Sequence, residues 1–256
     1  MHRRQALKLF AGLALCPLCG SRSRAADEHA GHHWSYEGET GPEKWGGLDP
    51  ANSVCGSGTQ QSPVDLSGPV KASQPRLDMR WSKRPQTIVN NGHTIQLNAP
   101  PGNTLTLGDR AYEMTQFHFH HPSEHLVGGR GFAMEAHFVH AAKDGGLAVV
   151  GVFIAPGHAN AVFNKIVSTM PAEEGPPVPA DPAIDPNGLL PRRLPYYRYE
   201  GSLTTPPCSE TVDWIVLADR IEVAEGDIAR FAKLYPMNAR PAQKRNRRFI
   251  LGAGAV

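Results

Sequence analysis

The 256-residue sequence lacks several features that mark special classes of protein. Charged residues make up 20% and hydrophobic residues 40% of the chain, so it does not have the composition of a disordered protein. No internal repeat is visible, which argues against solenoid and propeller architectures. No apolar run is long enough to cross a membrane as a helix. The length is compatible with one large domain or two small ones, and it is sufficient to bury a full core.

The N-terminal residues have the layout of an export signal. Arg3 and Arg4 form a positive start, residues 7–19 form a short apolar stretch, and two alanines follow at positions 25–26. This order is typical of a secretory signal peptide, and the paired arginines also resemble a twin-arginine signal. We therefore expect residues 1–25 to be a signal peptide and the mature protein to be periplasmic or secreted. The Sec and twin-arginine routes both remain open, and a disordered tail is the remaining alternative.

Loss of that leader removes the excess of positive charge. The full sequence has 26 Lys or Arg and 24 Asp or Glu, and residues 1–25 hold five of the basic residues and no acidic one. The mature chain therefore has 21 basic and 24 acidic residues and a formal net charge of −3. This balance gives no sign of a nucleic-acid-binding surface, so no nucleic acid partner is expected.

The mature chain is also poor in cysteine. Cys16 and Cys19 lie in the leader, so only Cys55 and Cys208 remain. Two cysteines in an oxidising compartment favour one disulfide, with two free buried thiols as the alternative.

Short strand patterns dominate the rest of the sequence. Residues 26–33 are expected to be a mobile tail whose histidines, His29, His32 and His33, could bind metal weakly. Residues 34–256 are expected to form one mainly β domain with peripheral helices. Strands are expected at 87–89, 94–97, 104–107, 111–121, 132–140, 147–154 and 214–218, helices at 161–170 and 227–235, and a proline-rich surface loop at 171–191.

A strand between residues 111 and 121 would gather two histidines on one face. Side chains alternate along a strand, so Gln116, His118 and His120 share a face, while Phe117 and Phe119 point to the other side and into a core. At a rise of about 3.3 Å per residue, the two histidine backbones lie roughly 6.6 Å apart. Their imidazoles can therefore converge on one metal ion.

The following strand supplies a third candidate ligand. Pro122 ends the first strand, and glycines between residues 128 and 131 permit the chain to return. Parity then places Glu135, His137 and Val139 on a common face. If the two strands pair in register, His137 lies beside the first two histidines. Three neutral imidazoles form a zinc site with a fourth position open for water.

Gln116 and Glu135 strengthen this interpretation. An H-x-H pair alone is a weak signal, because exposed histidines are common on strands. A metal-binding imidazole, however, needs an acceptor at its other ring nitrogen, and both residues lie on the right face to provide one. A buried Glu135 without a partner would be costly. The remaining histidines are expected to be structural or exposed: His121, His125, His140 and His158.

Several segments together resemble the alpha-class carbonic anhydrases, in particular the bacterial exported type. The segment QFHFH…SEH…EAHFVH resembles the metal-binding core of that family, and the other matches are QQSPVDL (60–66), NNGH (90–93), LAVVGVF (147–153) and YEGSLTTPPCSETVDWIVL (199–217). They follow in order from about Trp34 to Arg248. The resemblance implies a single domain around a large twisted, mostly antiparallel sheet. It also implies a zinc enzyme, monomeric or dimeric, that reversibly hydrates carbon dioxide to bicarbonate and a proton.

The resemblance also implies roles for individual residues. His118, His120 and His137 would hold the zinc ion. Thr204 would accept a hydrogen bond from zinc-bound hydroxide and donate one to Glu124, and His93 would shuttle protons. Asn91 and Gln96 would line the proton path, and substrate would be bound by Val139, Val149, Leu203, Thr204, Thr205, Val212 and Trp214.

A cysteine pair and two prolines also match the family, whereas two positions near the site differ from it. A bridge between Cys55 and Cys208 would tie the Thr204 loop to the N-terminal part of the domain. Pro63 and Pro207 correspond to cis-prolines of the family. His121 and Pro122 replace a common tryptophan, and Gln96 stands where many members have asparagine.

Two other functions remain open from the sequence. One is a catalytically silent carbonic-anhydrase-like binding domain, although such domains typically lose a zinc histidine and all three are present here. The other is an extracytoplasmic zinc-binding protein, which only the tail histidines indicate.

Overall fold

The computed structural model describes residues 33–254. The expected leader, the cysteines at positions 16 and 19, and the tail histidines His29 and His32 lie outside the described residues. The described part of the chain belongs to one compact unit that begins at His32. Within it, no helix combines the length and apolar character needed to cross a membrane.

Short strands make up most of the regular structure. The strands are β1 (Val70–Lys71), β2 (Leu77–Arg80), β3 (Thr87–Asn90), β4 (Ile95–Asn98), β5 (Thr104–Leu107), β6 (Arg110–His120), β7 (Met134–Ala141), β8 (Leu147–Pro156), β9 (Val178–Pro179), β10 (Tyr196–Gly201), β11 (Val212–Val223) and β12 (Leu251–Ala253). The α-helices are α1 (Trp45–Leu48), α2 (Val54–Ser57), α3 (Ala161–Thr169) and α4 (Glu225–Leu234), and the 3-10 helices are η1 (Gly38–Thr40), η2 (Pro50–Asn52) and η3 (Pro186–Leu189).

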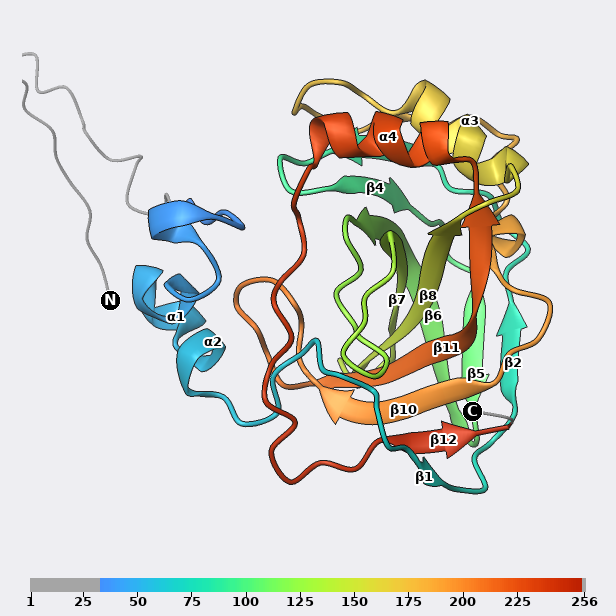
Figure 1. Cartoon of the computed structure of the whole chain (residues 1–256). Helices are drawn as coiled ribbons and strands as arrows, with labels where there is room; N and C mark the ends of the chain where they lie inside the picture. The colour runs from blue at the N-terminus through green and yellow to red at the C-terminus, as the bar shows by residue number, and fades with distance from the viewer. Residues whose placement is uncertain (1–32, 255–256) are drawn as a thin grey trace, which may run out of the picture. The chain divides into compact units, whose positions relative to one another are not determined.

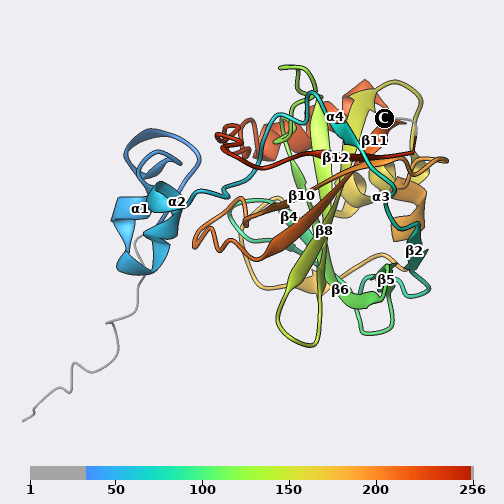
Figure 2. The ribbon, with the colours of Figure 1, turned by 90° about the horizontal axis from the view of Figure 1, so that it is seen from below.

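All of these strands belong to one twisted sheet (Figure 1). Its main order is β1-β12-β10-β11-β8-β7-β6-β4-β3-β9, and β5 joins β2 to β6. The β8–β11 and β1–β12 pairs are parallel, and the other pairs are antiparallel. The expected mainly β fold with a mostly antiparallel sheet is thus confirmed. Helices α3 and α4 contact each other beside the sheet (Figure 2).

The β6–β7 pair has the register that the histidine pattern required. His118 lies opposite His137, and His120 lies opposite Glu135. Phe117 and Phe119, which alternate with the two β6 histidines, are fully buried in the main core. A slip of one residue would have turned the histidines into that core, so burial of the phenylalanines fixes the register.

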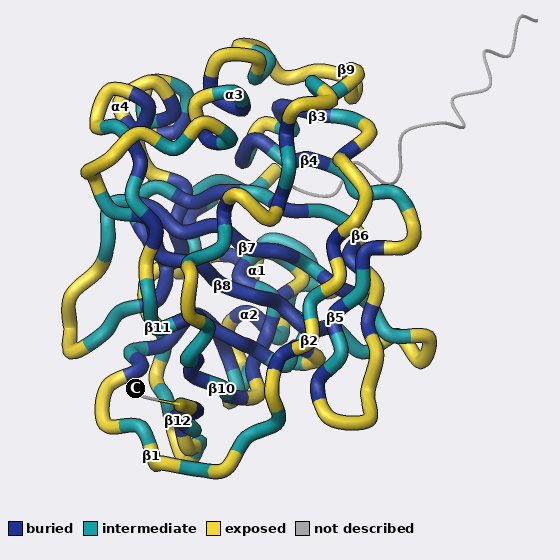
Figure 3. Tube along the Cα trace, turned by 90° about the vertical axis from the view of Figure 1, so that its right-hand side faces the viewer, coloured by how far each residue is buried: buried dark blue, intermediate teal, exposed yellow. Residues whose placement is uncertain are grey.

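The two faces of the sheet bury different apolar clusters, and the central strands are the most buried part of the chain (Figure 3). The main core includes Phe117, Phe119 and Phe138, with Phe163 of α3 and Phe231 of α4 packed on the same side. The opposite face carries a smaller cluster that includes Val149, Val212 and Trp214, with Val139 and Leu203 partly buried against it.

The proline-rich stretch differs from the expected structureless loop. Residues 178–179 form β9 at the edge of the sheet, paired with β3, and residues 186–189 form η3. Ile184 and Leu189 are fully buried. An edge strand tolerates Pro179, because one side of its backbone needs no hydrogen-bond donor. The bonds before Pro63 and Pro207 are cis as expected, and the bond before Pro122 is cis as well.

Candidate metal centre

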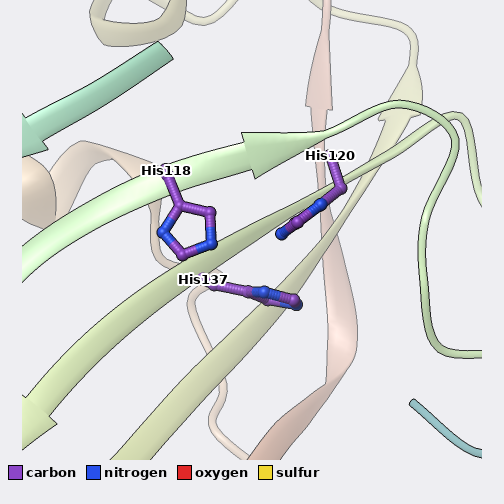
Figure 4. Close-up of side chains that lie close together, drawn as sticks. All are labelled: His118, His120 and His137. Atoms are coloured by element: carbon purple, nitrogen blue, oxygen red, sulfur yellow. The ribbon is translucent and has the colours of Figure 1, made fainter. Parts of the chain in front are cut away.

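Three imidazoles converge on the sheet face opposite the main core (Figure 4). His118 and His120 project from β6 and His137 projects from β7. Their ring centroids are 5.0, 5.4 and 4.5 Å apart. One ring nitrogen of each lies within 4.8 Å of a ring nitrogen of the other two. The three side chains therefore form a compact set of potential metal donors.

Side chains hold two of these rings in place. Nδ1 of His118 lies 2.8 Å from Oε1 of Gln116, and Nε2 of His137 lies 3.0 Å from Oε1 of Glu135. Each contact uses the acceptor that strand parity indicated. Nε2 of His118 and Nδ1 of His137 form no hydrogen bond with any residue that the structure describes.

The third ring is held by a residue that the sequence did not reveal. Nδ1 of His120 donates to the backbone carbonyl of Asn238, at 2.7 Å. Nε2 of His120 is buried and has no hydrogen-bond partner among the described residues. A buried polar atom without a partner is costly unless it binds something.

This donor set fits a zinc ion. Burial lowers the pKa of all three imidazoles, that of His120 to about 4. They are therefore neutral near pH 7, which is the state that binds metal. Three neutral imidazole nitrogens are a ligand set that zinc accepts with a fourth position open.

Glu135 lies at the centre of a buried hydrogen-bond network. Its Oε2 accepts the backbone N–H groups of Glu124 and His125 at 3.0 and 2.9 Å, and its Oε1 accepts Nδ1–H of His125 at 2.8 Å. Nε2 of His125 lies 2.6 Å from the hydroxyl of Tyr199, which donates to Oγ of Ser62. Burial raises the pKa of Glu135, but the histidines at 125 and 137 and their hydrogen bonds hold it well below its usual range. His125 is thus structural, as expected.

Glu124 is buried between the imidazoles and Thr204. Its Oε1 accepts the backbone N–H of Arg240 at 2.8 Å, and its Oε2 lies 3.9 Å from Nδ1 of His137. The pKa of Glu124 is raised to about 7, because burial outweighs the opposing effects of His137, the Arg240 N–H and the Thr204 side chain. Oε2 itself makes no hydrogen bond of ordinary geometry among the described residues.

His93 lies in the turn between β3 and β4. Its ring stacks on Trp34, with centroids 3.7 Å apart and planes 6° from parallel, and His33 lies 5.8 Å away. Burial, and then His33, lower the pKa of His93, while Glu174 raises it. Oδ1 of Asn91 accepts the backbone N–H of His93 at 3.0 Å and so shapes the turn.

The other expected site residues lie close by. Gln96 of β4 is opposite His118 in the sheet, and its amide donates to Asn98. The Trp214 ring is 4.8 Å from the His137 ring. The five apolar residues expected to bind substrate all belong to the smaller cluster: Val139, Val149, Leu203, Val212 and Trp214. Thr205, half-buried, accepts the Cys208 N–H at its carbonyl.

The structure contains the disulfide between Cys55 and Cys208, which are separated by 153 positions. Polar contacts extend from it towards the site. Gln61 donates to the Cys208 carbonyl, and the Arg240 guanidinium donates to the Cys55 carbonyl. Arg240 therefore joins the bridge to Glu124, which accepts its backbone N–H.

The histidines outside the cluster have the expected structural or exposed positions. His140 is buried and bonds the Phe138 carbonyl, and His158 is exposed beside Glu222. His121 contacts the carbonyl of Pro236.

Comparison with known sequences finds one family along most of the chain. The sequence model described as eukaryotic-type carbonic anhydrase matches residues 40–251. A carbonic anhydrase of Nostoc sp. is 39% identical over 263 residues, covering 99% of this chain and 98% of that protein. A carbonic anhydrase of Neisseria gonorrhoeae is 40% identical, covering 91% of this chain and 92% of that protein.

The fold is similar to that of solved structures as well. The alpha-carbonic anhydrase of Thermovibrio ammonificans, determined with the inhibitor sulfanilamide, matches with a TM-score of 0.84 and 41% identity. The match covers 86% of this chain and 99% of that one.

Proposed function

Because this chain belongs to the eukaryotic-type, or alpha, carbonic anhydrases, which interconvert carbon dioxide and bicarbonate, we propose that it does so with zinc held by His118, His120 and His137. The observation that carries the proposal is the orientation of the three rings. Each has one nitrogen bonded to an acceptor and the other free, and the free Nε2 of His120 is buried without a partner among the described residues.

Zinc bound there would lower the pKa of a water molecule from about 15.7 to about 7, which makes hydroxide available at neutral pH. The protein contributes orientation. Gln116, Glu135 and the Asn238 carbonyl favour one tautomer of each histidine, so that Nε2 of His118 and His120 and Nδ1 of His137 would be the atoms offered to the metal.

We assign Thr204 and Glu124 to the orientation of the nucleophile. When the Glu124 carboxyl is ionised it can only accept hydrogen bonds, so in this pairing the Thr204 hydroxyl is the donor. Oγ1 of Thr204 can then accept a hydrogen bond from the attacking hydroxide, and a lone pair of the hydroxide would thereby be aimed at the substrate. The effect of Thr204 on the pKa of Glu124 supports this pairing.

We assign the smaller apolar cluster to carbon dioxide. The substrate is apolar, so Val139, Val149, Leu203, Val212 and Trp214 suit it better than charged groups would. The contact between Trp214 and His137 supports the assignment, because it brings this cluster up to the metal ligands.

Proton release is assigned to His93. With its pKa lowered from the ordinary value, the imidazole is neutral near pH 7 and can accept a proton from water. Asn91, Gln96 and Thr205 are proposed to line the water path that leads to it.

We also propose that the chain is exported and that residues 1–25 are removed. The disulfide supports an oxidising destination. Intact-mass measurement on protein recovered from the periplasm or medium tests this, and retention of the leader would contradict it.

The central experiment measures carbon dioxide hydration by stopped flow, together with bound zinc. Chelation should remove both zinc and activity, and added zinc should restore them. His118→Ala should lose zinc and activity, whereas the exposed His158→Ala should keep both. Zinc binding without hydration would favour a silent or zinc-binding protein and would reject the proposed enzyme.

A further inference from the structure

The C-terminal part of the chain has a one-sided charge. Residues 228–256 contain seven Lys or Arg and no Asp or Glu, although residues 26–256 carry a net charge of −3. Four of the seven, Lys244, Arg245, Arg247 and Arg248, directly precede Phe249 within five positions. Positive charge is thus concentrated in one segment of an otherwise acidic molecule.

This segment lies beside exposed apolar side chains. Phe249 is 70% exposed and Val70 is 48% exposed, and only two other large hydrophobic residues of the described chain are exposed to a similar degree. The backbone N–H of Val70 donates to the Ile250 carbonyl at 2.8 Å, and Val70 pairs with Leu251. Phe249 and Val70 are therefore neighbours at the β1 edge of the sheet.

Two arginines anchor the segment and leave the other basic groups free. The Arg248 guanidinium donates to the carbonyls of Glu200 and Gln61, and that of Arg245 donates to the carbonyl of Ser67. The exposed side chains of Lys244 and Arg247 form no hydrogen bond or ion pair with any described residue. The fold thus presents the cation of Arg247 in a common lining with Phe249, and that of Lys244 earlier in the same anchored segment.

A groove of about 400 Å³ runs beside this segment, between Arg247, Phe249 and Leu251 on one side and β10 on the other. The carboxylate of Asp213 in its wall accepts hydrogen bonds from Nε and Nη2 of Arg198, at 2.9 and 2.7 Å. Glu200 is the remaining acid, opposite Arg247 and Arg248. The lining therefore keeps a net positive charge, which suits an anionic group.

We propose that this surface, the C-terminal basic edge (Val70, Lys244, Arg247 and Phe249), docks on membranes rich in anionic lipid. Phe249 would enter the boundary between headgroups and acyl chains, Lys244 and Arg247 would meet phosphates, and the groove would take one headgroup. Cationic side chains around an exposed aromatic ring form the pattern of interfacial protein segments. An acidic protein partner would complement the charge as well. A single exposed ring among free cations favours the lipid boundary, and binding of poly-glutamate in place of vesicles would favour the protein.

The test is co-sedimentation of the full chain with vesicles of phosphatidylglycerol and phosphatidylcholine, or of phosphatidylcholine alone. Binding should require the anionic lipid and weaken in high salt. Lys244→Gln/Arg247→Gln should reduce binding roughly tenfold or more. The matched control Lys143→Gln/Arg192→Gln loses the same charge from exposed residues elsewhere and should bind like the parent. Equal binding by the two double variants would overturn the proposal.

A second measurement reports from position 249 itself, because residues 1–32 are common to every variant and could bind lipid on their own. The tryptophan introduced by Phe249→Trp should be quenched by lipids brominated in their acyl chains. Adding Lys244→Gln/Arg247→Gln should abolish that quenching. No quenching, or binding of poly-glutamate without binding of vesicles, would reject the lipid assignment.

Discussion

At the scale of single residues, His93 combines a lowered pKa with a flat stack on Trp34. Replacing it with alanine removes a proton acceptor and should leave the metal centre intact. In weak buffer, His93→Ala should therefore lower maximal turnover by roughly 100-fold with little change in kcat/KM for carbon dioxide. Added imidazole should restore the turnover. Stopped-flow assays across buffer concentrations measure both effects, and loss of bound zinc in this variant would contradict the assignment.

His140 should make the fold sensitive to mild acid. Burial lowers its pKa to about 4, compared with about 6.5 for an unfolded chain. Above pH 6.5 both states are neutral and the group has no effect. Between pH 6.5 and 4 the unfolded chain binds a proton that the folded chain does not. As the pH decreases through this range, the free energy of unfolding should therefore decrease, by up to about 3 kcal/mol from this group.

His140→Asn provides the comparison, because its amide can replace the Nδ1–H donor to the Phe138 carbonyl. Urea unfolding at pH 7 and pH 5 should show a smaller loss of stability in the variant than in the parent protein. Equal losses would assign the acid sensitivity to other groups.

At the scale of elements, close contact between β7 and β8 fixes Glu135. Gly151 of β8 lies opposite His137, and a Cβ at that position would be 2.9 Å from Oε1 of Glu135. Gly151→Ala should displace the carboxylate and loosen His137, weakening zinc affinity roughly tenfold. Competition with a chromogenic chelator measures this. Gly226→Ala, where a Cβ meets nothing within 4 Å, is the control and should keep the parent affinity.

The sequence predicted the elements whose pattern is local. The alternation of apolar and polar residues near the end of β6 and in β7 predicted which side chains share a face, whereas the pairing register was a condition of the prediction that the structure meets. Strand β10 was missed: β11 is the next strand in the chain, but β12, its other partner, comes only near the C-terminal end of the described residues. The predicted strand at 214–218 was too short for the same reason, since β11 extends over Val212–Val223 along the distant β8.

The hydrogen-bond acceptors of the candidate site were predictable where the acceptor is a side chain. Gln116 and Glu135 could be inferred, because their faces follow from strand parity. Asn238 could not, since its carbonyl acts on His120 and every residue has a carbonyl. Its position depends on how the C-terminal segment packs, which no local pattern records.

At the scale of the whole molecule, the disulfide joins segments 153 positions apart and lies one contact from the Glu124–Arg240 pair. Reduction should lower the free energy of unfolding by about 2–4 kcal/mol, because the unfolded chain regains the freedom of a long loop. Thermal unfolding with and without a reductant measures the change. Identical melting temperatures would show that packing alone holds the two segments together.

The late position of Asn238 in the sequence has a consequence for the order in which the site forms during synthesis. Its backbone carbonyl holds His120, its amide donates to the carbonyls of His93 and Phe119, and its N–H and Oδ1 bond the backbone of His121. A ribosome makes His118, His120 and His137 well before it reaches this residue. The acceptor that orients His120 is therefore in place only when Asn238 has been synthesised and has docked, so a nascent chain first carries the three histidines without it.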